Sequence, residues 1–278
     1  RLYVIDRRTA DWKPVPLVGA PAIGTVGIMP VDADESNAYF LTATDYLTPT
    51  TLSLGEIGQA PEKLKSMPAF FDAAGLQITQ HFAISDDGTR VPYFMVARQG
   101  MTADGTHPTL LYGYGGFEIS LQPSYSAGVG RAWTTQGGVY VVANIRGGGE
   151  YGPRWHQGAL KANRLRAYED FAAVARDLFA RKITSPRRLG IQGGSNGGLL
   201  VGNMVTLYPD LMQAAVCQVP LLDMRRYNQL LAGASWMAEY GNPDKPEEWE
   251  FIRRFSPYHN VRPDGKYPSV LFTTSTRD

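Results

Sequence analysis

A serine flanked by glycines is the residue with the clearest potential for chemistry in this sequence of 278 residues. Gly193, Ser195 and Gly197 form the pattern Gly-x-Ser-x-Gly between a predicted strand and an apolar run typical of a helix. A serine hydroxyl is a poor nucleophile unless a tight turn presents it to a base, and glycines permit such a turn. The backbone N–H of Asn196 would then face a developing oxyanion. The alternative is a glycine-rich turn that holds a serine by chance, which the flanking strand and helix make less favoured.

An aspartate follows this serine in the order expected for a catalytic triad. In folds with such a turn the acid lies at the end of a later strand, and the histidine comes after the acid. The apolar run 269–273 leads to Asp278, which is therefore the predicted acid; the alternative is an ordinary loop aspartate. No histidine follows Asp278 in the sequence, and His156 and His259 are interpreted as structural or loop residues. We therefore expect the chain as given to lack its general base.

Two further glycine-rich stretches, residues 111–120 and 144–152, also follow predicted strands. Neither matches a phosphate-binding loop or a convincing dinucleotide fingerprint, so nucleotide binding is not expected. In the first stretch, a tyrosine among glycines could offer its hydroxyl to an oxyanion. A phenol with a pKa of about 10 suits that role because it is a hydrogen-bond donor at neutral pH.

The composition argues against several other kinds of function. The formal net charge is +1 with mixed signs, which gives no footprint for nucleic acid or an anionic membrane. The single cysteine, Cys217, excludes an internal disulfide, and the four histidines lack the spacing of a zinc site. No apolar run approaches the roughly 20 residues of a membrane span. We expect no metal, no cofactor, no nucleic-acid or membrane partner, and a small or peptide-sized substrate.

The elements that would position these residues fall into two regions. Residues 1–75 carry short alternating strand candidates between turns and are predicted to be all-β, as in a propeller or a sandwich. A hairpin signal at Asp87 and Gly88 marks the start of the second region, residues 76–278. There, apolar strands alternate with helical segments such as the amphipathic run 165–182. This alternation predicts an α/β fold with a mostly parallel sheet, whose ligands gather at the carboxyl ends of the strands.

Four motifs in order resemble the prolyl oligopeptidase family. They are residues 112–117 (Tyr-Gly-Tyr-Gly-Gly-Phe), 144–152 (Asn-Ile-Arg-Gly-Gly-Gly-Glu-Tyr-Gly), 193–198 (Gly-Gly-Ser-Asn-Gly-Gly) and 256–261 (Ser-Pro-Tyr-His-Asn-Val). The resemblance covers residues from about 82 onward. It implies an incomplete α/β-hydrolase catalytic domain over residues 76–278, preceded by the last part of a β-propeller over residues 1–75.

The resemblance also implies a role for each matching position. Ser195 would be the nucleophile, and Asp278 would orient the histidine. The Tyr114 hydroxyl and the Asn196 N–H would form the oxyanion hole. A pocket for proline is implied at four apolar positions, Phe117, Leu221, Trp236 and Tyr240. A flat indole can stack on a pyrrolidine ring, although without the resemblance these aromatic side chains would be interpreted as core.

The implied function is that of a serine-type endopeptidase or oligopeptidase that cleaves short peptides after proline through an acyl-enzyme, without a cofactor. The expected partner is a short proline-containing peptide, and the protein is expected to be a monomer. Without the family's histidine, the chain alone is expected to be inactive. The alternatives are a peptidase specific for basic residues, an acylaminoacyl peptidase, an esterase and a non-catalytic scaffold. The compartment stays open, with the cytoplasm favoured over the periplasm.

Overall fold

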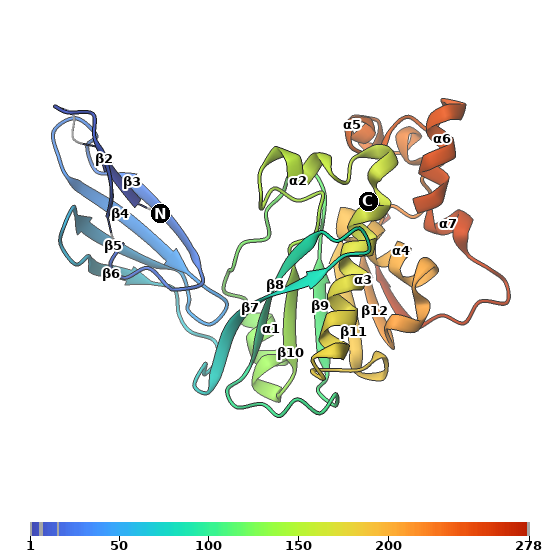
Figure 1. Cartoon of the computed structure of the whole chain (residues 1–278), viewed down its shortest axis with the longest axis horizontal. Coiled ribbons are helices and arrows are strands. Elements are labelled where there is room, and N and C mark those ends of the chain that lie inside the picture. The colour runs from blue at the N-terminus through green and yellow to red at the C-terminus, as the bar shows by residue number, and fades with distance from the viewer. Residues whose placement is uncertain (1, 6–7, 16, 277–278) are drawn as a thin grey trace. The chain divides into compact units, whose positions relative to one another are not determined.

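The fold is described from a computed structural model of the chain (Figure 1). The structure describes every residue except 1, 6, 7, 16, 277 and 278. The predicted acid Asp278 therefore lies outside the described residues. In the described part of the chain, no helix combines the length and the apolar character needed to cross a membrane.

The chain folds as two compact units. The first consists of residues 1–78 and 122–135, and the second of residues 79–121 and 136–278. The change from one unit to the other falls inside strand β7 (Leu76–Ile84). Residues 122–135 thus return to the first unit after the second has begun, a return that the predicted boundary at residue 75 does not include.

The first unit is built mainly of antiparallel strands. Its strands are β1 (Leu2–Ile5), β2 (Trp12–Val15), β3 (Thr25–Pro30), β4 (Ala38–Thr44), β5 (Thr51–Glu56) and β6 (Glu62–Ser66). Strands β3 to β6 form a four-stranded sheet in sequence order, and β1 pairs with β2. Tyr39, Leu41 and Ala43 alternate along β4 and are buried, as expected for a strand with one face on a core. Helix α1 (Ala127–Ala132) also lies in this unit and is capped by Ser126.

A seven-stranded sheet forms the centre of the second unit, with the order β13-β12-β11-β9-β10-β8-β7. Besides β7, its strands are β8 (Arg90–Arg98), β9 (Thr109–Gly113), β10 (Val139–Ala143), β11 (Leu189–Gly194), β12 (Ala214–Gln218) and β13 (Ser269–Thr273). Strands β9 to β13 pair in parallel, whereas β8 is antiparallel to β10. The sheet is thus mostly parallel, as predicted from the alternation of strands and helices.

The α-helices of this unit follow β10, β11 and β12. They are α2 (Pro153–Gln157), α3 (Leu165–Ala180), α4 (Asn196–Leu207), α5 (Met237–Tyr240), α6 (Pro246–Ile252) and α7 (Pro257–Asn260). Short 3-10 helices span Thr134–Gln136, Lys161–Asn163, Pro186–Arg188, Pro209–Leu211, Tyr227–Gln229, Gly233–Trp236 and Arg253–Phe255. The predicted helix 165–182 is thereby confirmed as α3, two residues shorter. Its Tyr168, Phe171 and Leu178 form a buried stripe against the core.

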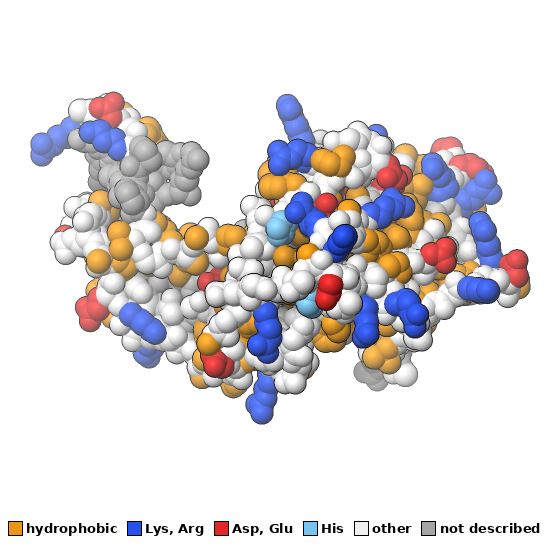
Figure 2. Space-filling view, turned by 60° about the horizontal axis from the view of Figure 1, so that its bottom comes forward, with side chains coloured by type: hydrophobic (Ala, Val, Ile, Leu, Met, Phe, Trp, Pro, Cys, Tyr) orange, Lys and Arg blue, Asp and Glu red, His pale blue; other side chains and the backbone are white. Residues whose placement is uncertain are grey.

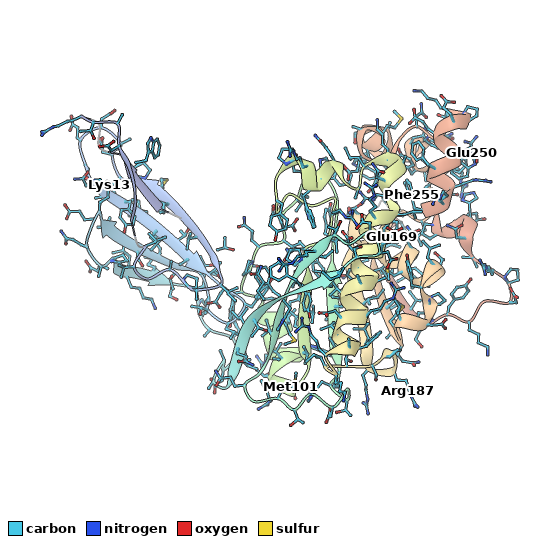
Figure 3. All side chains as sticks on the ribbon, in the orientation of Figure 1. Lys13, Met101, Glu169, Arg187, Glu250 and Phe255 are labelled. Atoms are coloured by element: carbon cyan, nitrogen blue, oxygen red, sulfur yellow. The ribbon has the colours of Figure 1, made fainter. Side chains whose placement is uncertain are left out.

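The core of the second unit is continuous from the sheet to the C-terminal helices. Ile191 of β11, Leu199 of α4 and Phe255 are each 1% exposed or less. Figure 3 labels Phe255 among the C-terminal helices. Burial of these apolar side chains stabilises the packing of α4 on the sheet, directly after the serine motif. On the face drawn in Figure 2, cationic and anionic side chains are interspersed over this unit.

A buried ion pair joins three segments of the second unit. Arg146, which follows β10, donates from Nε to Asp170 Oδ2 at 2.9 Å and from Nη2 to Asp170 Oδ1 at 2.6 Å. Asp170 on α3 is fully buried and also accepts a hydrogen bond from Ser85 Oγ at 2.6 Å. Arg146 Nη1 reaches Asp87 Oδ2 at 2.5 Å. Removal of one partner from a buried pair costs at most roughly 3–5 kcal/mol, and after loss of Asp170 the charge of Arg146 would be balanced by Asp87 alone.

The Asp87 pair predicts a pH dependence of stability. The hydrogen bond from Arg146 holds the pKa of Asp87 below its usual value of 3.8. Because the folded-state pKa is depressed, the stabilisation is fully present above pH 3.8 and is lost as the pH falls through the lower folded-state value. We expect Asp87→Asn to lower the melting temperature at neutral pH. The expected loss in the free energy of unfolding is at most about 1 kcal/mol, because this carboxylate is partly solvated.

This difference is measured by thermal unfolding of both proteins from pH 7 down to about pH 2.5, and it is expected to shrink below the unfolded-state pKa. Asp86→Asn is the matched control, because Asp86 is exposed and its ion pair with exposed Arg176 is long, at 3.4 Å. A difference for Asp87→Asn that grows at acid pH contradicts the assignment.

Candidate active site

Ser195 lies at the sharp turn between β11 and α4. Its φ of 58° and ψ of −119° are rare for a residue other than glycine, and its side chain is exposed. The Ser195 N–H donates to the Gln218 carbonyl of β12 at 3.0 Å, and its own carbonyl accepts from the N–H of Gly198 at 2.8 Å. The turn is therefore fixed from both sides at the carboxyl end of β11. The strand, turn and helix required by the nucleophile hypothesis are present; the role of the hydroxyl stays a prediction.

The glycines of the motif are required by close backbone contacts. A Cβ at Gly193 would lie 2.3 Å from the Gly197 carbonyl oxygen, and one at Gly197 would lie 2.7 Å from the Gly113 carbonyl oxygen. A Cβ at Gly198 would lie 2.6 Å from the Gln218 carbonyl oxygen. No side chain fits at these positions unless β9, β11 or α4 moves.

Tyr114 and Asn196, the two predicted oxyanion donors, lie beside this turn. Tyr114 follows β9. Burial raises the pKa of the Tyr114 hydroxyl, and the nearby Ser195 side chain offsets part of this rise, so the phenol keeps its proton at neutral pH. Asn196 is the first residue of α4, where a backbone N–H has no acceptor within the helix. Its Nδ2 donates to the Tyr114 carbonyl at 2.6 Å, which ties the two donors together.

A buried polar network holds the Asn196 side chain from behind. Asn196 Oδ1 accepts hydrogen bonds from the Tyr240 hydroxyl, at 2.8 Å, and from Arg164 Nη2. Arg164 in turn donates from Nη1 to Glu239 Oε1 at 2.8 Å. Both charged side chains are nearly inaccessible, with 1% of Arg164 and 4% of Glu239 exposed. Desolvation of such charges is tolerated only because they are paired.

Glu239 also reaches two other segments. Its Oε1 accepts from the backbone N–H of Phe117 at 3.0 Å, and its Oε2 lies 2.7 Å from His156 Nε2. Sequence reasoning missed both Arg164 and Glu239, because neither belongs to a recognisable motif. The one available signal was a carboxylate directly before Tyr240 in an otherwise apolar stretch, since a charge there must find a buried partner.

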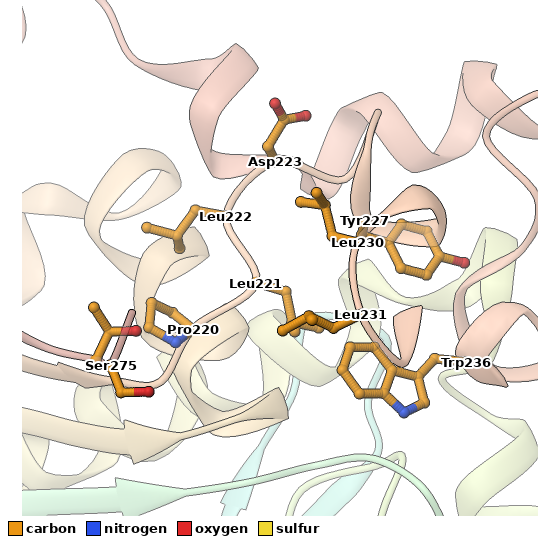
Figure 4. A pocket seen from close by; sticks show the side chains of 10 residues that line it. Pro220, Leu221, Leu222, Asp223, Tyr227, Leu230, Leu231, Trp236 and Ser275 are labelled. Atoms are coloured by element: carbon orange, nitrogen blue, oxygen red, sulfur yellow. The ribbon is translucent and has the colours of Figure 1, made fainter. Parts of the chain in front are cut away.

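The four residues predicted to bind proline fall into two pairs in the structure. Leu221 and Trp236 line a pocket of about 200 Å3 (Figure 4). Phe117 and Tyr240 pack edge to face, with ring centroids 5.6 Å apart. Tyr240 has no exposed surface, so its ring supports Phe117 from inside. The full pocket lining is Pro220, Leu221, Leu222, Asp223, Tyr227, Leu230, Leu231, Trp236, Thr274 and Ser275.

Each of the four histidines has a hydrogen-bond partner other than Ser195. The pairs are His81 with Thr79, His107 with the Thr102 carbonyl, His156 with Glu239, and His259 with Ser256. The interpretation of His156 and His259 as structural residues stays a prediction.

Comparison with known proteins identifies the family. The prolyl oligopeptidase family model matches residues 123–278. The chain belongs to the prolyl oligopeptidase family. The resemblance seen in the sequence motifs is thereby confirmed.

Proteins with similar sequences are longer than this chain. An uncharacterized peptidase of Sinorhizobium fredii is 56% identical over 88% of this chain and 34% of its own length. The prolyl endopeptidase of Elizabethkingia miricola is 39% identical over 100% of this chain and 39% of its own length. The chain thus spans 34% to 39% of the length of these relatives.

Solved structures of prolyl oligopeptidases share the fold. A post-proline cleaving enzyme from Rickettsia typhi superimposes with a TM-score of 0.85 at 37% identity, over 96% of this chain and 38% of that one. A prolyl endopeptidase structure gives a TM-score of 0.87 at 40% identity, over 94% of this chain and 38% of that one. The predicted α/β-hydrolase fold class is therefore confirmed.

The packing of the serine turn predicts the effect of one added methyl group. In Gly197→Ala the new Cβ would meet the Gly113 carbonyl oxygen at 2.7 Å, so β9 and α4 must separate. We expect a loss of roughly 1–3 kcal/mol in stability, as for other overpacked sites. Gly190→Ala in β11 is the control, because its nearest contact would be 3.8 Å. Thermal unfolding compares the two variants, and equal melting temperatures refute the steric argument.

Proposed function

We propose that the protein to which this chain belongs is a serine peptidase that cleaves short peptides after proline. One observation carries this proposal: Ser195 stands exposed on a strained turn at the end of β11, and the next residue, Asn196, binds the Tyr114 carbonyl beside that turn. A hydroxyl held there can attack a carbonyl carbon, and a neighbouring phenol can stabilise the resulting oxyanion. Relatives of similar sequence carry the name prolyl endopeptidase, which supports the same reaction.

In the proposed reaction, Ser195 Oγ attacks the carbonyl carbon of the substrate proline and passes its proton to a histidine oriented by Asp278. The carbonyl oxygen becomes an oxyanion that accepts hydrogen bonds from the Tyr114 hydroxyl and the Asn196 N–H. Collapse of this intermediate breaks the C–N bond, and the amine leaves with the proton from the histidine. Water then hydrolyses the acyl-enzyme. Among the described residues, the hydrogen bonds of the four histidines go to groups other than Ser195, and the inactivity of this chain alone stays a prediction.

The pocket lining favours proline over a basic residue. Leu221 and Trp236 provide apolar walls, and a flat indole can stack on a pyrrolidine ring. Asp223 is the carboxylate among the lining residues, and Arg226 already pairs with it at 2.6 Å. A substrate arginine or lysine would have to compete with that pair. Phe117 and Tyr240 are proposed to complete the wall, with Phe117 facing the substrate and Tyr240 supporting it.

The two regions are proposed to belong to different domains of the whole protein. Residues 1–75 are assigned to the last part of a β-propeller, because β3 to β6 form a four-stranded antiparallel sheet like a propeller blade. Residues 76–278 are assigned to the catalytic domain. The substrate is proposed to be a short proline-containing peptide, and the protein is proposed to act as a monomer.

Hydrolysis of chromogenic peptides by the full-length protein tests the proposed function. We expect faster turnover, as kcat/KM, when proline precedes the leaving group than when arginine does. Ser195→Ala is expected to lower kcat by at least about 10³-fold, because the nucleophile is lost. Faster cleavage after arginine would indicate a peptidase specific for basic residues. Turnover of acylated amino acids or simple esters alone would indicate an acylaminoacyl peptidase or an esterase. No turnover of any of these substrates would indicate a non-catalytic scaffold.

The oxyanion role of Tyr114 makes a separate prediction. Tyr114→Phe removes only the hydroxyl, and we expect kcat to fall about 10²-fold or more with little change in KM. Tyr93→Phe is the matched control, because it also loses a buried hydroxyl, which donates to Asp177 Oδ2 at 2.6 Å. Steady-state kinetics of both variants decide the matter. An unchanged kcat for Tyr114→Phe would remove this residue from the oxyanion hole.

A further inference from the structure

Glu239 is the point where three separate segments meet behind the serine turn. Its carboxylate contacts the Phe117 N–H after β9, His156 on α2, and Arg164 before α3. Hydrogen bonds between ionised groups are shorter and roughly twice as strong as neutral ones. Because this carboxylate is only 4% exposed, little water competes for these donors. A shift of Glu239 would therefore be transmitted to all three segments.

One of these contacts leads directly to the proposed oxyanion hole. Arg164 bridges Glu239 and Asn196 Oδ1, while Asn196 Nδ2 holds the Tyr114 carbonyl. The Asn196 amide thereby sets the spacing between its own backbone N–H and Tyr114. Arg164 is buried, so without Glu239 its charge would lack this carboxylate partner. The Arg164 side chain would then be free to shift, and its hydrogen bond to Asn196 Oδ1 would weaken.

The second contact leads to the proposed substrate pocket. Phe117 has a φ of 56°, a strained conformation for a side chain of its size. Its N–H is held by Glu239 Oε1 at 3.0 Å, and its ring rests on Tyr240. The bond to Glu239 therefore helps keep the Phe117 backbone in a conformation that it rarely adopts.

We propose that Glu239 is a positioning residue, which sets the oxyanion hole through Arg164 and Asn196 and the wall of the proline pocket through Phe117. This inference rests on the proposed function. It adds a residue that contacts neither the substrate nor Ser195 but determines where the groups that do so are placed. Positional errors of about 1 Å in such groups can reduce rates about 10²-fold.

A second buried carboxylate provides a matched control. Asp170 on α3 is 0% exposed and pairs with Arg146 at 2.6 Å, much as Glu239 pairs with Arg164 at 2.8 Å. Its partners are Arg146, in the loop after β10, and Ser85, in the turn between β7 and β8. Loss of Asp170 leaves Arg146 with Asp87 alone, and loss of Glu239 removes the carboxylate that pairs with Arg164. Only the loss of Glu239 is expected to disturb Asn196 and Phe117.

The test is steady-state kinetics of the full-length protein with a proline substrate, together with melting temperatures. We expect Glu239→Ala to lower kcat by about 10- to 100-fold and to raise KM several-fold. Glu239→Gln is expected to restore most of both values, because the amide oxygen still accepts hydrogen bonds from Phe117 and Arg164. Asp170→Ala is expected to lower the melting temperature while kcat stays within about twofold.

The inference is overturned if Glu239→Ala and Asp170→Ala lose stability alike and both keep the kcat of the wild type. If Glu239→Ala does not fold, Glu239→Asp decides, because it keeps the negative charge but withdraws the carboxylate from the Phe117 N–H and Arg164. A several-fold lower kcat supports the inference, and an unchanged kcat and KM overturn it. Absence of turnover by the wild type would instead refute the proposed function and the inference with it.

Discussion

The sharp turn at Ser195 is the constraint on which the rest of the site depends. A φ of 58° is unfavourable for serine, and the turn persists because β11 and α4 are packed into the core on either side of it. The same packing brings backbone carbonyls so close to Gly193 and Gly197 that no side chain fits. Strain, glycine pattern and exposure of the hydroxyl are thus consequences of one short connection between a strand and a helix.

Charges buried beside this turn are tolerated because each finds its partner within the same unit. The second unit contains two arginine-carboxylate pairs of similar burial, Arg146 with Asp170 and Arg164 with Glu239. The first fastens a hairpin and α3 to the loop after β10. The second ends at the Asn196 side chain, beside the serine. Both pairs join an arginine to a buried carboxylate. They differ in the further partner of the arginine, which is Asp87 for Arg146 and the Asn196 side chain for Arg164.

Local patterns were sufficient for the elements and for the serine. The strands of the parallel sheet are short and largely apolar, and α3 carries a buried stripe with helical spacing, so both were predictable. The ends were less well defined: α3 stops at Ala180, and Lys182 has a φ of 56° that no helix continues. Helices such as α5, with four residues, are too short to show a periodic pattern.

The sequence by itself determined the Gly-x-Ser-x-Gly motif, the α/β character and the resemblance to prolyl oligopeptidases, because each of these depends on residues that are neighbours in the chain. Only the tertiary structure decided that Glu239 meets Arg164 and Phe117, which lie 75 and 122 residues away. It also buried Tyr240 and placed residues 122–135 with the first unit. The physical reason is the strand order, in which β9 is inserted between β10 and β11. Such non-local pairing brings distant loops to one edge of the sheet, and no local pattern records it.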